Sequence, residues 1–363
     1  MKANKLALFS FGLSLLGAGA ALAQTATTEP VGFNTVTCLP GSDTRCSVPL
    51  TSQTAFIGAV STATSDAGLA TITPSGVLNW TVNSYALNYY VKMTTGSKSG
   101  VYYQIVSNGS GNVVVNLDGD TLAINPTDSF RIEKFWTLAE LFPPATQVTV
   151  VPSTNLGGLG RRTEIRFPDS TSAGINLATS RTFFLTASTF ASAPSTWHEA
   201  TNGNAVANNV FLPPDSFFIV RHGSAQITTA TVYTIVGGID LSPNSTVLLT
   251  QQNDKQDNPV THSRPVPVAL VDLDLVSSGA FVGSNGQGGL ARRDELLVFD
   301  NSVNAVNKAP TNTYFFDSTA GFWKHSTTFA NSDSVTIGAA EGFVIRKART
   351  SGGPSAVVWQ QTF

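Results

Sequence analysis

Two copies of the pattern Arg-Arg-x-Glu are the residues best suited to chemistry in this chain, in which only 12% of the 363 residues are charged. They are Arg161, Arg162 and Glu164 in the octapeptide 157–164, and Arg292, Arg293 and Glu295 in the octapeptide 288–295. Guanidinium groups grip carboxylates, sulfates and sugar hydroxyls, so one interpretation is a pair of related ligand sites. The other is an Arg–Glu network that starts a strand and packs over an aromatic ring such as Phe167 or Phe299. We expect the structural interpretation, because a duplication reproduces structural pairs as faithfully as it reproduces sites.

Other polar side chains could supply metal ligands or catalytic groups, yet none forms a recognised motif. The acidic runs 118–120, 253–258 and 272–274 could offer oxygen ligands to calcium, but none matches an EF-hand or a glycine-rich calcium loop. The four histidines, which have no paired spacing, are His198, His222, His262 and His325. The sequence therefore predicts no catalytic residue, no metal and no cofactor, although a carboxylate pair for glycoside hydrolysis remains open.

The two cysteines, Cys38 and Cys46, flank a Pro-Gly turn at 40–41. In an oxidising compartment this spacing predicts a disulfide that staples a hairpin. Two free thiols and half of a metal site are the alternatives. No histidine or further cysteine lies close in sequence to complete a metal site, so we expect the disulfide.

Five tryptophans could form a platform on which sugar rings stack. They are Trp80, Trp136, Trp197, Trp323 and Trp359. Trp197 and Trp323 recur at equivalent places in repeated segments, and packing in the core is the commoner fate of an indole ring there. We therefore expect core packing.

The first 23 residues indicate where the protein goes. Lys2 and Lys5 precede an apolar run over 6–22, and Ala21-Leu22-Ala23 supplies the cleavage site of a secretory signal peptide. A membrane anchor fits less well, because the run of about 17 residues is rich in Gly and Ala. A formal net charge of −2 argues against nucleic acid as a partner. We expect an exported protein, in the periplasm, at the cell surface or outside the cell, with no transmembrane helix.

Short strand-like segments dominate the rest of the chain. They are rich in Val, Ile, Thr, Phe and Tyr and are bounded by Gly, Pro, Asn or Asp. Helical character is limited to 137–142, where a turn or two of helix could form before Pro143. The sequence predicts an all-β protein.

The repeated octapeptide belongs to a tandem duplication of a β unit. Residues 182–184 align with 314–316, Trp197 with Trp323, and residues 217–221 with 343–347. The segments 31–42 and 232–244 are also alike, which suggests that each unit begins with a strand, a turn and a second strand. Repeated units bury their apolar faces in themselves or against each other, so the duplication predicts two related sandwich-like or barrel-like bodies.

We divide the chain accordingly. The first unit is discontinuous and comprises residues 24–51 and 133–225, residues 52–132 form an inserted small β module, and residues 226–363 form the second unit. Within the insertion we predict strands at 56–60, 80–83, 90–93, 100–108, 113–117 and 128–132.

The inserted segment resembles a small barrel-like β module that occurs in many exported and phage-type proteins. The resemblance covers 56–132 and rests on Gly-x-Tyr-x-x-Ile-x-x-Asn at 100–108 and Asp-x-Phe-x-Ile at 128–132. It implies a spacer or accessory domain and little about activity.

The whole mature chain is similar to an uncharacterised family of exported proteins, present as multiple paralogues in verrucomicrobial and related bacteria. The segments that carry this resemblance are 29–33, 41–44, 100–103, 135–138, 292–297 and 342–347. Apolar strand residues are expected in that family where this chain has its cysteines. The resemblance implies export and a β-rich fold, with no established activity.

Three function classes follow. The leading hypothesis is an exported, non-enzymatic structural or binding protein of the cell surface or matrix, with polysaccharide as its candidate partner. An outer-membrane β-barrel is the second, suggested by Phe363 at the C-terminus and by the many strands, but it is opposed by the lack of ten-residue alternating strands. A secreted enzyme that acts on polysaccharide is the third.

Overall fold

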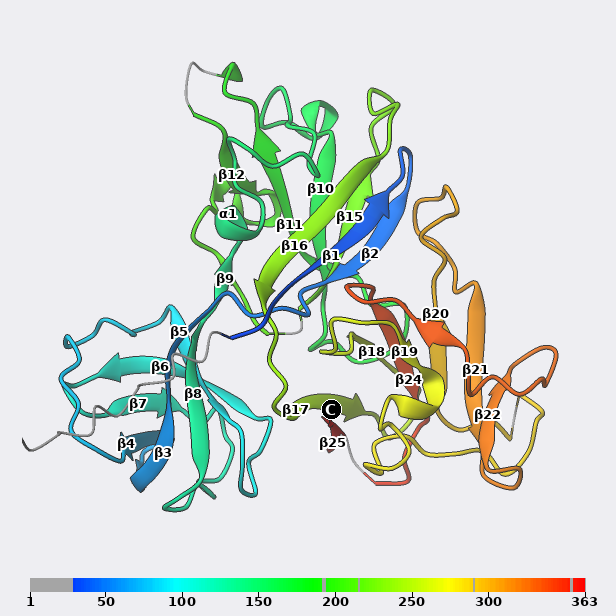
Figure 1. The fold of residues 1–363 in the computed structure, drawn as a ribbon. Helices are drawn as coiled ribbons and strands as arrows, with labels where there is room; N and C mark the ends of the chain where they lie inside the picture. Colours follow the sequence, from blue (N-terminus) through cyan, green and yellow to red (C-terminus); the bar gives the residue numbers. More distant parts are fainter. Residues whose placement is uncertain (1–28, 191–193, 215, 290, 353–354, 363) are drawn as a thin grey trace, which may run out of the picture.

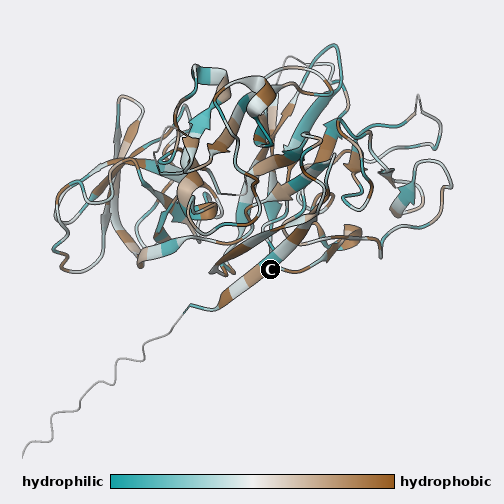
Figure 2. Ribbon diagram, turned by 90° about the horizontal axis from the view of Figure 1, so that it is seen from above, coloured by the Kyte–Doolittle hydropathy of each residue, from teal (hydrophilic) through white to brown (hydrophobic). Residues whose placement is uncertain are grey.

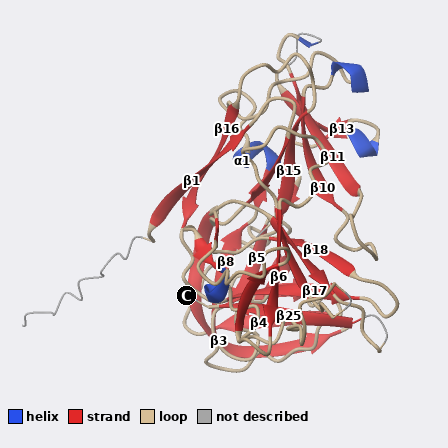
Figure 3. Ribbon diagram, turned by 90° about the vertical axis from the view of Figure 1, so that its right-hand side faces the viewer, coloured by secondary structure: helices blue, strands red, loops and turns tan. Residues whose placement is uncertain are grey.

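The structure is a computed structural model that describes residues 29–190, 194–214, 216–289, 291–352 and 355–362. The predicted signal peptide, residues 1–23, lies outside the described residues. Strands account for 43% of the structure and helix for 4%, which confirms the predicted all-β class. Figure 3 shows helix only as short turns among the strands. Within the described ranges, no helix is long and apolar enough to cross a membrane.

The first unit is a six-stranded antiparallel sheet with a two-stranded ribbon packed on one face. The sheet has the order β13 (Ala205–Val206), β12 (Thr196–Glu199), β11 (Thr179–Thr186), β10 (Thr163–Pro168), β15 (Phe217–His222) and β2 (Asp43–Ser47). The ribbon pairs β1 (Val31–Cys38) with β16 (Thr231–Gly238). Buried and exposed residues alternate along both ribbon strands, so one face enters a core that contains Trp197, Phe218 and Tyr233.

A short pair of strands completes the first unit. β9 (Trp136–Thr137) pairs with β14 (Phe211–Leu212), and the single-turn helix α1 (Leu138–Leu141) follows β9 directly. Thr137 and Glu140 cap this helix reciprocally, which explains why a helix begins there as the sequence predicts. Short 3₁₀ turns lie at Gly158–Gly160 and Ala200–Asn202.

The second unit repeats the same strand order. Its sheet runs β18 (Gln256–Val260), β24 (Phe343–Lys347), β20 (Glu295–Val298), β21 (Asn312–Asp317) and β22 (Phe322–His325), and these strands correspond in turn to β2, β15, β10, β11 and β12. The ribbon pairs β17 (Asn244–Thr250) with β25 (Ser355–Gln361), and the short pair is β19 (Val268–Ala269) with β23 (Thr336–Ile337). A 3₁₀ turn at Leu270–Asp272 follows β19, as α1 follows β9. The core of the unit contains Trp323, Phe343 and Trp359.

The inserted module is a closed barrel of six strands. Around the barrel these are β3 (Gln53–Asp66), β4 (Leu69–Pro74), β7 (Val113–Asn116), β6 (Tyr102–Asn108), β5 (Tyr89–Met93) and β8 (Ser129–Lys134). Figure 1 shows the barrel at the lower left, between β2 and β9 in the chain and apart from the two sheets. β4 was not predicted, and the segment 80–83, predicted as a strand, forms a turn. Figure 2 shows apolar and polar residues interspersed along the strands of all three parts.

The boundary between the units lies later than the sequence suggests. β16 pairs along its whole length with β1, from Val31 opposite Gly238 to Cys38 opposite Thr231. β16 therefore belongs to the first unit, and the second unit begins at β17 rather than at residue 226. The apolar pattern of β16 resembles that of β1 because the two strands share one face of the same ribbon.

Two of the sequence alignments between the units are shifted by one residue. Phe183 lies opposite Ile165 and Tyr314 lies opposite Leu296, so Phe183 matches Tyr314 rather than Phe315. The same shift applies between β15 and β24. A slip of one residue exchanges the faces of a strand, and consecutive aromatic residues concealed this slip in the sequence.

The two units contact each other through a reciprocal arrangement. The loop between β20 and β21 covers β2 of the first unit, where the Asn307 N–H donates to Asp43 Oδ2 at 2.7 Å. The loop between β10 and β11 covers β18 of the second unit, where the Asn176 N–H donates to Asp257 Oδ2 at 2.8 Å. Both asparagines have a left-handed backbone, with φ of 53° and 54°. The units are thus related by a pseudo-twofold axis, as in an isologous dimer.

Candidate functional site

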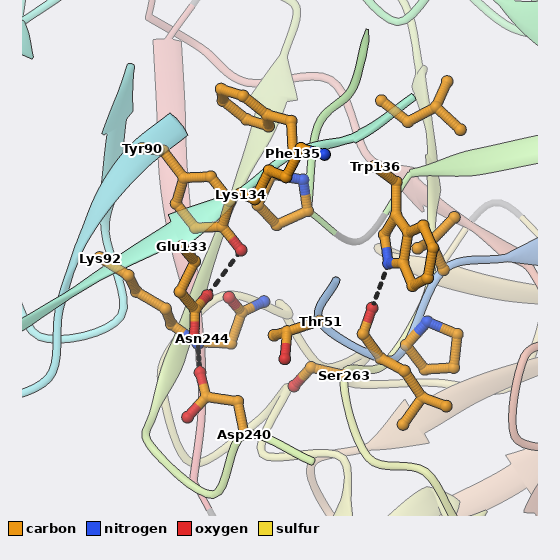
Figure 4. A pocket seen from close by; sticks show the side chains of 15 residues that line it. Thr51, Tyr90, Lys92, Glu133, Lys134, Phe135, Trp136, Asp240, Asn244 and Ser263 are labelled. Carbon is orange, nitrogen blue, oxygen red and sulfur yellow. Dashed lines mark hydrogen bonds and ion pairs between the residues drawn. The ribbon is translucent and has the colours of Figure 1, made fainter. Parts of the chain in front are cut away.

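A buried cluster of charges joins the barrel to the two units (Figure 4). Lys92 Nζ lies 2.6 Å from Asp240 Oδ2, which connects β5 of the barrel to the segment between β16 and β17. Arg131 on β8 contacts Asp240 at 3.5 Å and also pairs with Glu29, which precedes β1. Two residues further along β8, Glu133 accepts a hydrogen bond of 2.6 Å from the Tyr90 hydroxyl. These contacts fix the orientation of the barrel.

The charges in this cluster influence one another strongly. Burial raises the pKa of Glu133, which is 0% exposed, and the nearby Asp240 carboxylate adds to the effect. Burial opposes ionisation of Asp240 as well, but Lys92 and the Ser242 N–H outweigh it and lower its pKa. The small cavity beside these groups measures only about 30 Å³, which is room for a water molecule rather than a substrate. The cluster therefore attaches the barrel to the two units and is not a ligand site.

A glycine brings a barrel loop against the second unit. Gly100 has a φ of +85°, and a Cβ on it would lie 2.8 Å from the backbone of Asn244 on β17. Across this contact the Ser245 N–H donates to the carbonyl of Gly100 at 3.1 Å. This close approach leaves an open space on one side of the loop.

That space is a cleft of about 910 Å³ between the barrel and the second unit. The barrel contributes the loop 97–101, β6 and the turn 116–120, while the second unit contributes the outer face of its ribbon. The floor is apolar, because Val247 of β17 and Val358 of β25 are paired there and are 59% and 50% exposed. A cleft of this size between domains is a typical ligand site.

Charged and polar groups form one rim of the cleft. Asp120 accepts hydrogen bonds from Lys98 Nζ at 2.6 Å and from the Tyr103 hydroxyl at 2.7 Å. Burial opposes ionisation of Asp120, yet these two donors lower its pKa. Asp118, two residues earlier, is exposed at the same rim. With Lys98 and the two carboxylates, the rim has a net charge of −1.

Aromatic rings form the opposite wall. Phe211 on β14 stacks on Phe135, with ring centroids 5.0 Å apart and planes at 28°. Tyr102 on β6 meets Phe135 edge to face at 6.4 Å. Phe211 is 38% exposed and lines the cleft with Tyr102, so an apolar ligand face could stack here.

A second hollow shares part of this wall. Tyr102, Phe211 and Pro213 also line this second hollow of about 370 Å³, which runs toward Arg181 and Phe217 of the first unit. We refer to the cleft and this hollow together as the groove, because they share these three lining residues.

The repeated Arg-Arg-x-Glu residues lie outside this groove, and their contacts are internal. Arg161 stacks over Phe184 at 4.7 Å and pairs with Glu164 at 3.7 Å, while Arg166 Nε donates to Glu164 at 2.9 Å. The backbone N–H of Arg162 donates to Ser153 Oγ at 3.2 Å. These contacts favour the structural interpretation of the first motif.

The second motif repeats the same contacts. Arg292 stacks over Phe315 at 5.1 Å and pairs with Glu295 at 3.8 Å, and the Arg293 N–H donates to Ser284 Oγ at 2.9 Å. Lys255 takes the place of Arg166 by pairing with Glu295 at 2.8 Å. The stacking rings are residues of β11 and β21 rather than the predicted Phe167 or Phe299.

The predicted disulfide is not present, and the predicted hairpin is wrong. Cys38 and Cys46 are both free thiols and both 0% exposed. β1 pairs with β16 and β2 pairs with β15, so the two cysteines lie in different sheets of the sandwich core instead of on paired strands. Burial raises the pKa of the Cys46 thiol, which packs as a small apolar side chain.

We therefore expect both thiols to be protected only by the fold. Iodoacetamide should leave the native protein unmodified, because both thiols are fully buried and the reagent cannot reach them. In denaturant without reductant, intact mass should show two alkylations, at Cys38 and Cys46. Absence of alkylation until a reductant is added would contradict this prediction.

The remaining candidate residues lie apart from the groove or in the cores. Within the described ranges, no group of three or more acidic, histidine or cysteine side chains could hold a metal ion. His222 and His262 are buried, and Trp197, Trp323 and Trp359 pack in the two cores as predicted. Of the acidic runs proposed for calcium, only 118–120 borders the cleft.

The groove residues were not identified from the sequence as a site. Phe211 and Val358 lie in short apolar segments far apart in the chain, and nothing in their spacing indicates that they line one cleft. The only available signal was the acidic run 118–120 inside a module that also carries adjacent tyrosines. Comparison of the chain with protein families, curated proteins and solved structures found no match.

Proposed function

We propose that this is an exported, non-enzymatic binding protein that holds a neutral glycan chain in the cleft between the barrel and the second unit. The observation that carries the proposal is the combination of an exposed aromatic wall, an apolar floor and a rim of hydrogen-bonding groups in one cleft of about 910 Å³. Sugar rings offer apolar faces to aromatic side chains and hydroxyl groups to carboxylates and amides. The N-terminal sequence supports export.

The charge of the rim supports a neutral ligand. A net charge of −1 from Lys98, Asp118 and Asp120 repels acidic glycans more than neutral ones. The second hollow, which shares Tyr102, Phe211 and Pro213 with the cleft, supports a chain of several sugar units rather than a single sugar.

Binding fits the carboxylates of the cleft better than hydrolysis does. Asp120 is kept ionised by Lys98 and Tyr103, so it is suited to accept hydrogen bonds from sugar hydroxyls rather than to donate a proton. Glu133 has a raised pKa, as a general acid requires, but it faces the small closed cavity beside the buried charge cluster.

Replacement of the exposed ring should weaken binding without unfolding the protein. We expect Phe211→Ala to reduce affinity for a neutral oligosaccharide at least tenfold, which corresponds to about 1.4 kcal/mol of lost stacking. Asp118→Ala should reduce it by a similar or larger factor, because a charge-assisted hydrogen bond is lost. A glycan array followed by calorimetry measures both effects.

Phe33→Ala is the matched control, since Phe33 is a more exposed ring, at 71%, on β1 outside the cleft. It should leave affinity unchanged. If no neutral glycan binds the native protein, or if Phe33→Ala weakens binding as much as Phe211→Ala, the proposal is refuted.

A further inference from the structure

A separate cavity of about 410 Å³ lies between the two units, near their pseudo-twofold axis. Its walls come from β2, β10 and β15 of the first unit, from β18, β20 and β24 of the second, and from the two covering loops. Five cationic side chains line it, against two carboxylates. The cations are Arg45, Arg166, Arg221, Lys308 and Arg346, and the carboxylates are Asp43 and Asp257.

Three of the five cations are neutralised. Arg221 forms a bidentate pair with Asp43, with both distances 2.6 Å, and Arg346 forms the symmetry-related pair with Asp257 at 2.7 and 2.9 Å. Arg166 pairs with Glu164, just outside the cavity. The two Arg–Asp pairs occupy equivalent positions in the two units and hold the interface together, whereas Arg166 pairs with a residue of its own strand.

The other two cations, Arg45 and Lys308, have no such partner. Both are only 9% exposed, and within the described part of the chain neither has a carboxylate oxygen within 4.0 Å. The Arg45 guanidinium stacks 3.3 Å above Phe299 and donates from Nη2 to the Lys308 carbonyl at 3.2 Å, while its Nη1 has no hydrogen-bond partner. Lys308 Nζ donates to the carbonyl of Asp300 at 3.0 Å.

The pKa values of both side chains reflect their burial. Burial lowers the pKa of Arg45 to about 10; the Asp43 carboxylate opposes this decrease, and the charge of Arg221 adds to it. Burial also lowers the pKa of Lys308, and the charge of Arg45 adds to that effect. Asp43 and Asp300 act on these cations only from a distance. Two adjacent buried cations with no carboxylate in direct contact are unfavourable unless an anion completes the site.

The pseudo-twofold symmetry shows that the fold does not need these charges. Arg45 lies opposite Ile219 as Pro259 lies opposite Val344, so the equivalent of Arg45 in the second unit is Pro259. Asn307 and Asn176 are equivalent, and Lys308 and Leu177 follow them directly, so the equivalent of Lys308 in the first unit is Leu177. The same interface is thus built once with two cations and once with two uncharged residues.

We propose that Arg45 and Lys308 form a binding site for a small organic anion, in which a carboxylate, sulfate or phosphate group meets the two cations and an apolar body occupies the rest of the cavity. Phe217, Phe299 and Leu297 are among the apolar wall residues that would contact such a body. A guanidinium with a free Nη1 beside an ammonium group matches the geometry of an oxyanion with two or three acceptor oxygens. The site does not rest on the glycan cleft of about 910 Å³, with which it shares no lining residue, although Phe217 is among its residues that also line the second hollow.

Calorimetry on the full mature protein at low ionic strength tests this inference. The probes are sodium benzoate, sodium acetate, sodium sulfate and inorganic phosphate, with sodium chloride at matched ionic strength as the reference. We expect saturable binding at one site, tighter for benzoate than for acetate, and a rise in melting temperature with benzoate that chloride does not produce. Tighter binding of sulfate or phosphate than of benzoate would refute the claim that the cavity holds an apolar ligand body.

Two variants identify the residues. Lys308→Leu copies the residue at the equivalent position of the first unit, and Arg45→Met keeps the apolar length of the side chain. Each should weaken benzoate binding at least tenfold, while the melting temperature without ligand stays equal or rises, because a buried uncompensated charge is removed. Lys134→Met, which removes a cation at a half-exposed pair with Glu140, should leave benzoate binding unchanged. Undiminished binding by the Arg45→Met and Lys308→Leu proteins, or no saturable binding of any probe by the native protein, would overturn the proposal.

Discussion

A Lys347→Met variant should lose about 3 to 5 kcal/mol of unfolding free energy. Lys347 Nζ pairs with Asp294, and the two side chains are 3% and 1% exposed. Asp294 also accepts hydrogen bonds from the backbone N–H groups of Val282 at 2.7 Å and Ala348 at 2.8 Å. Removal of the ammonium group leaves a buried carboxylate without its cation. Urea denaturation at pH 7 measures the loss.

The first unit supplies a matched neutral version of this pair. Thr163 and His222 occupy the equivalent positions, with Thr163 Oγ1 2.8 Å from His222 Nδ1. Thr163 accepts the Val151 N–H at 3.0 Å, as Asp294 accepts that of Val282. The double variant Asp294→Thr/Lys347→His should therefore recover part of the stability that Lys347→Met loses.

A cation at a half-exposed ion pair provides the control. Lys134 pairs with Glu140, and their side chains are 27% and 36% exposed, so Lys134→Met should change stability by less than about 1 kcal/mol. Equal stability of Lys347→Met and the native protein, or a double variant no better than the single one, would contradict the account.

The stability of the protein should fall as the pH is lowered from about 6.5 to about 4. Burial lowers the pKa of His222 and of His262 from 6.5 to about 4, and the two residues are 0% and 1% exposed. Between pH 6.5 and 4 the unfolded chain binds a proton at each histidine, whereas the folded chain does not. The free energy of unfolding is therefore highest above pH 6.5 and decreases through this window. The loss is on the order of 3 kcal/mol for each histidine.

Urea denaturation at a series of pH values measures this dependence. His222→Gln and His262→Gln should each remove part of the slope between pH 6.5 and 4, and the double variant should remove most of it. Glu133 and Glu341, whose pKa values are raised by burial, act in the opposite sense, because the folded protein binds their protons more tightly. A double histidine variant that keeps the full slope would show that other groups cause it.

Much of the architecture followed from local patterns in the chain. Alternating apolar residues and turn residues identified the all-β class. The barrel-like character of the inserted segment was implied by its resemblance to a known module, and the structure shows a closed barrel. The short helix α1 lies inside the predicted segment 137–142, and the structure adds that Thr137 and Glu140 cap it reciprocally. Each of these features depends on residues within one or two turns of the chain.

The pairing of strands that are far apart in the sequence could not be predicted from local patterns. β16 looks like the first strand of a second unit, and only its pairing with β1, about 200 residues earlier, assigns it to the first. The cysteines flank a turn in the sequence, yet their strands diverge into two sheets. Alternation specifies which face of a strand is buried, but not which distant strand covers it.

The amino-acid pattern alone thus determined the class of fold, the duplication and the presence of the module, because local alternation and repetition are properties of contiguous residues. Tertiary packing decided where chemistry is possible. The cleft needs Gly100 to bring a barrel loop to β17, and the anion cavity needs Arg45 and Lys308, 263 residues apart, to meet across the pseudo-twofold interface. Such sites arise when separately folded parts dock, and the free energy of docking is carried by contacts between residues that have no sequence relation to one another.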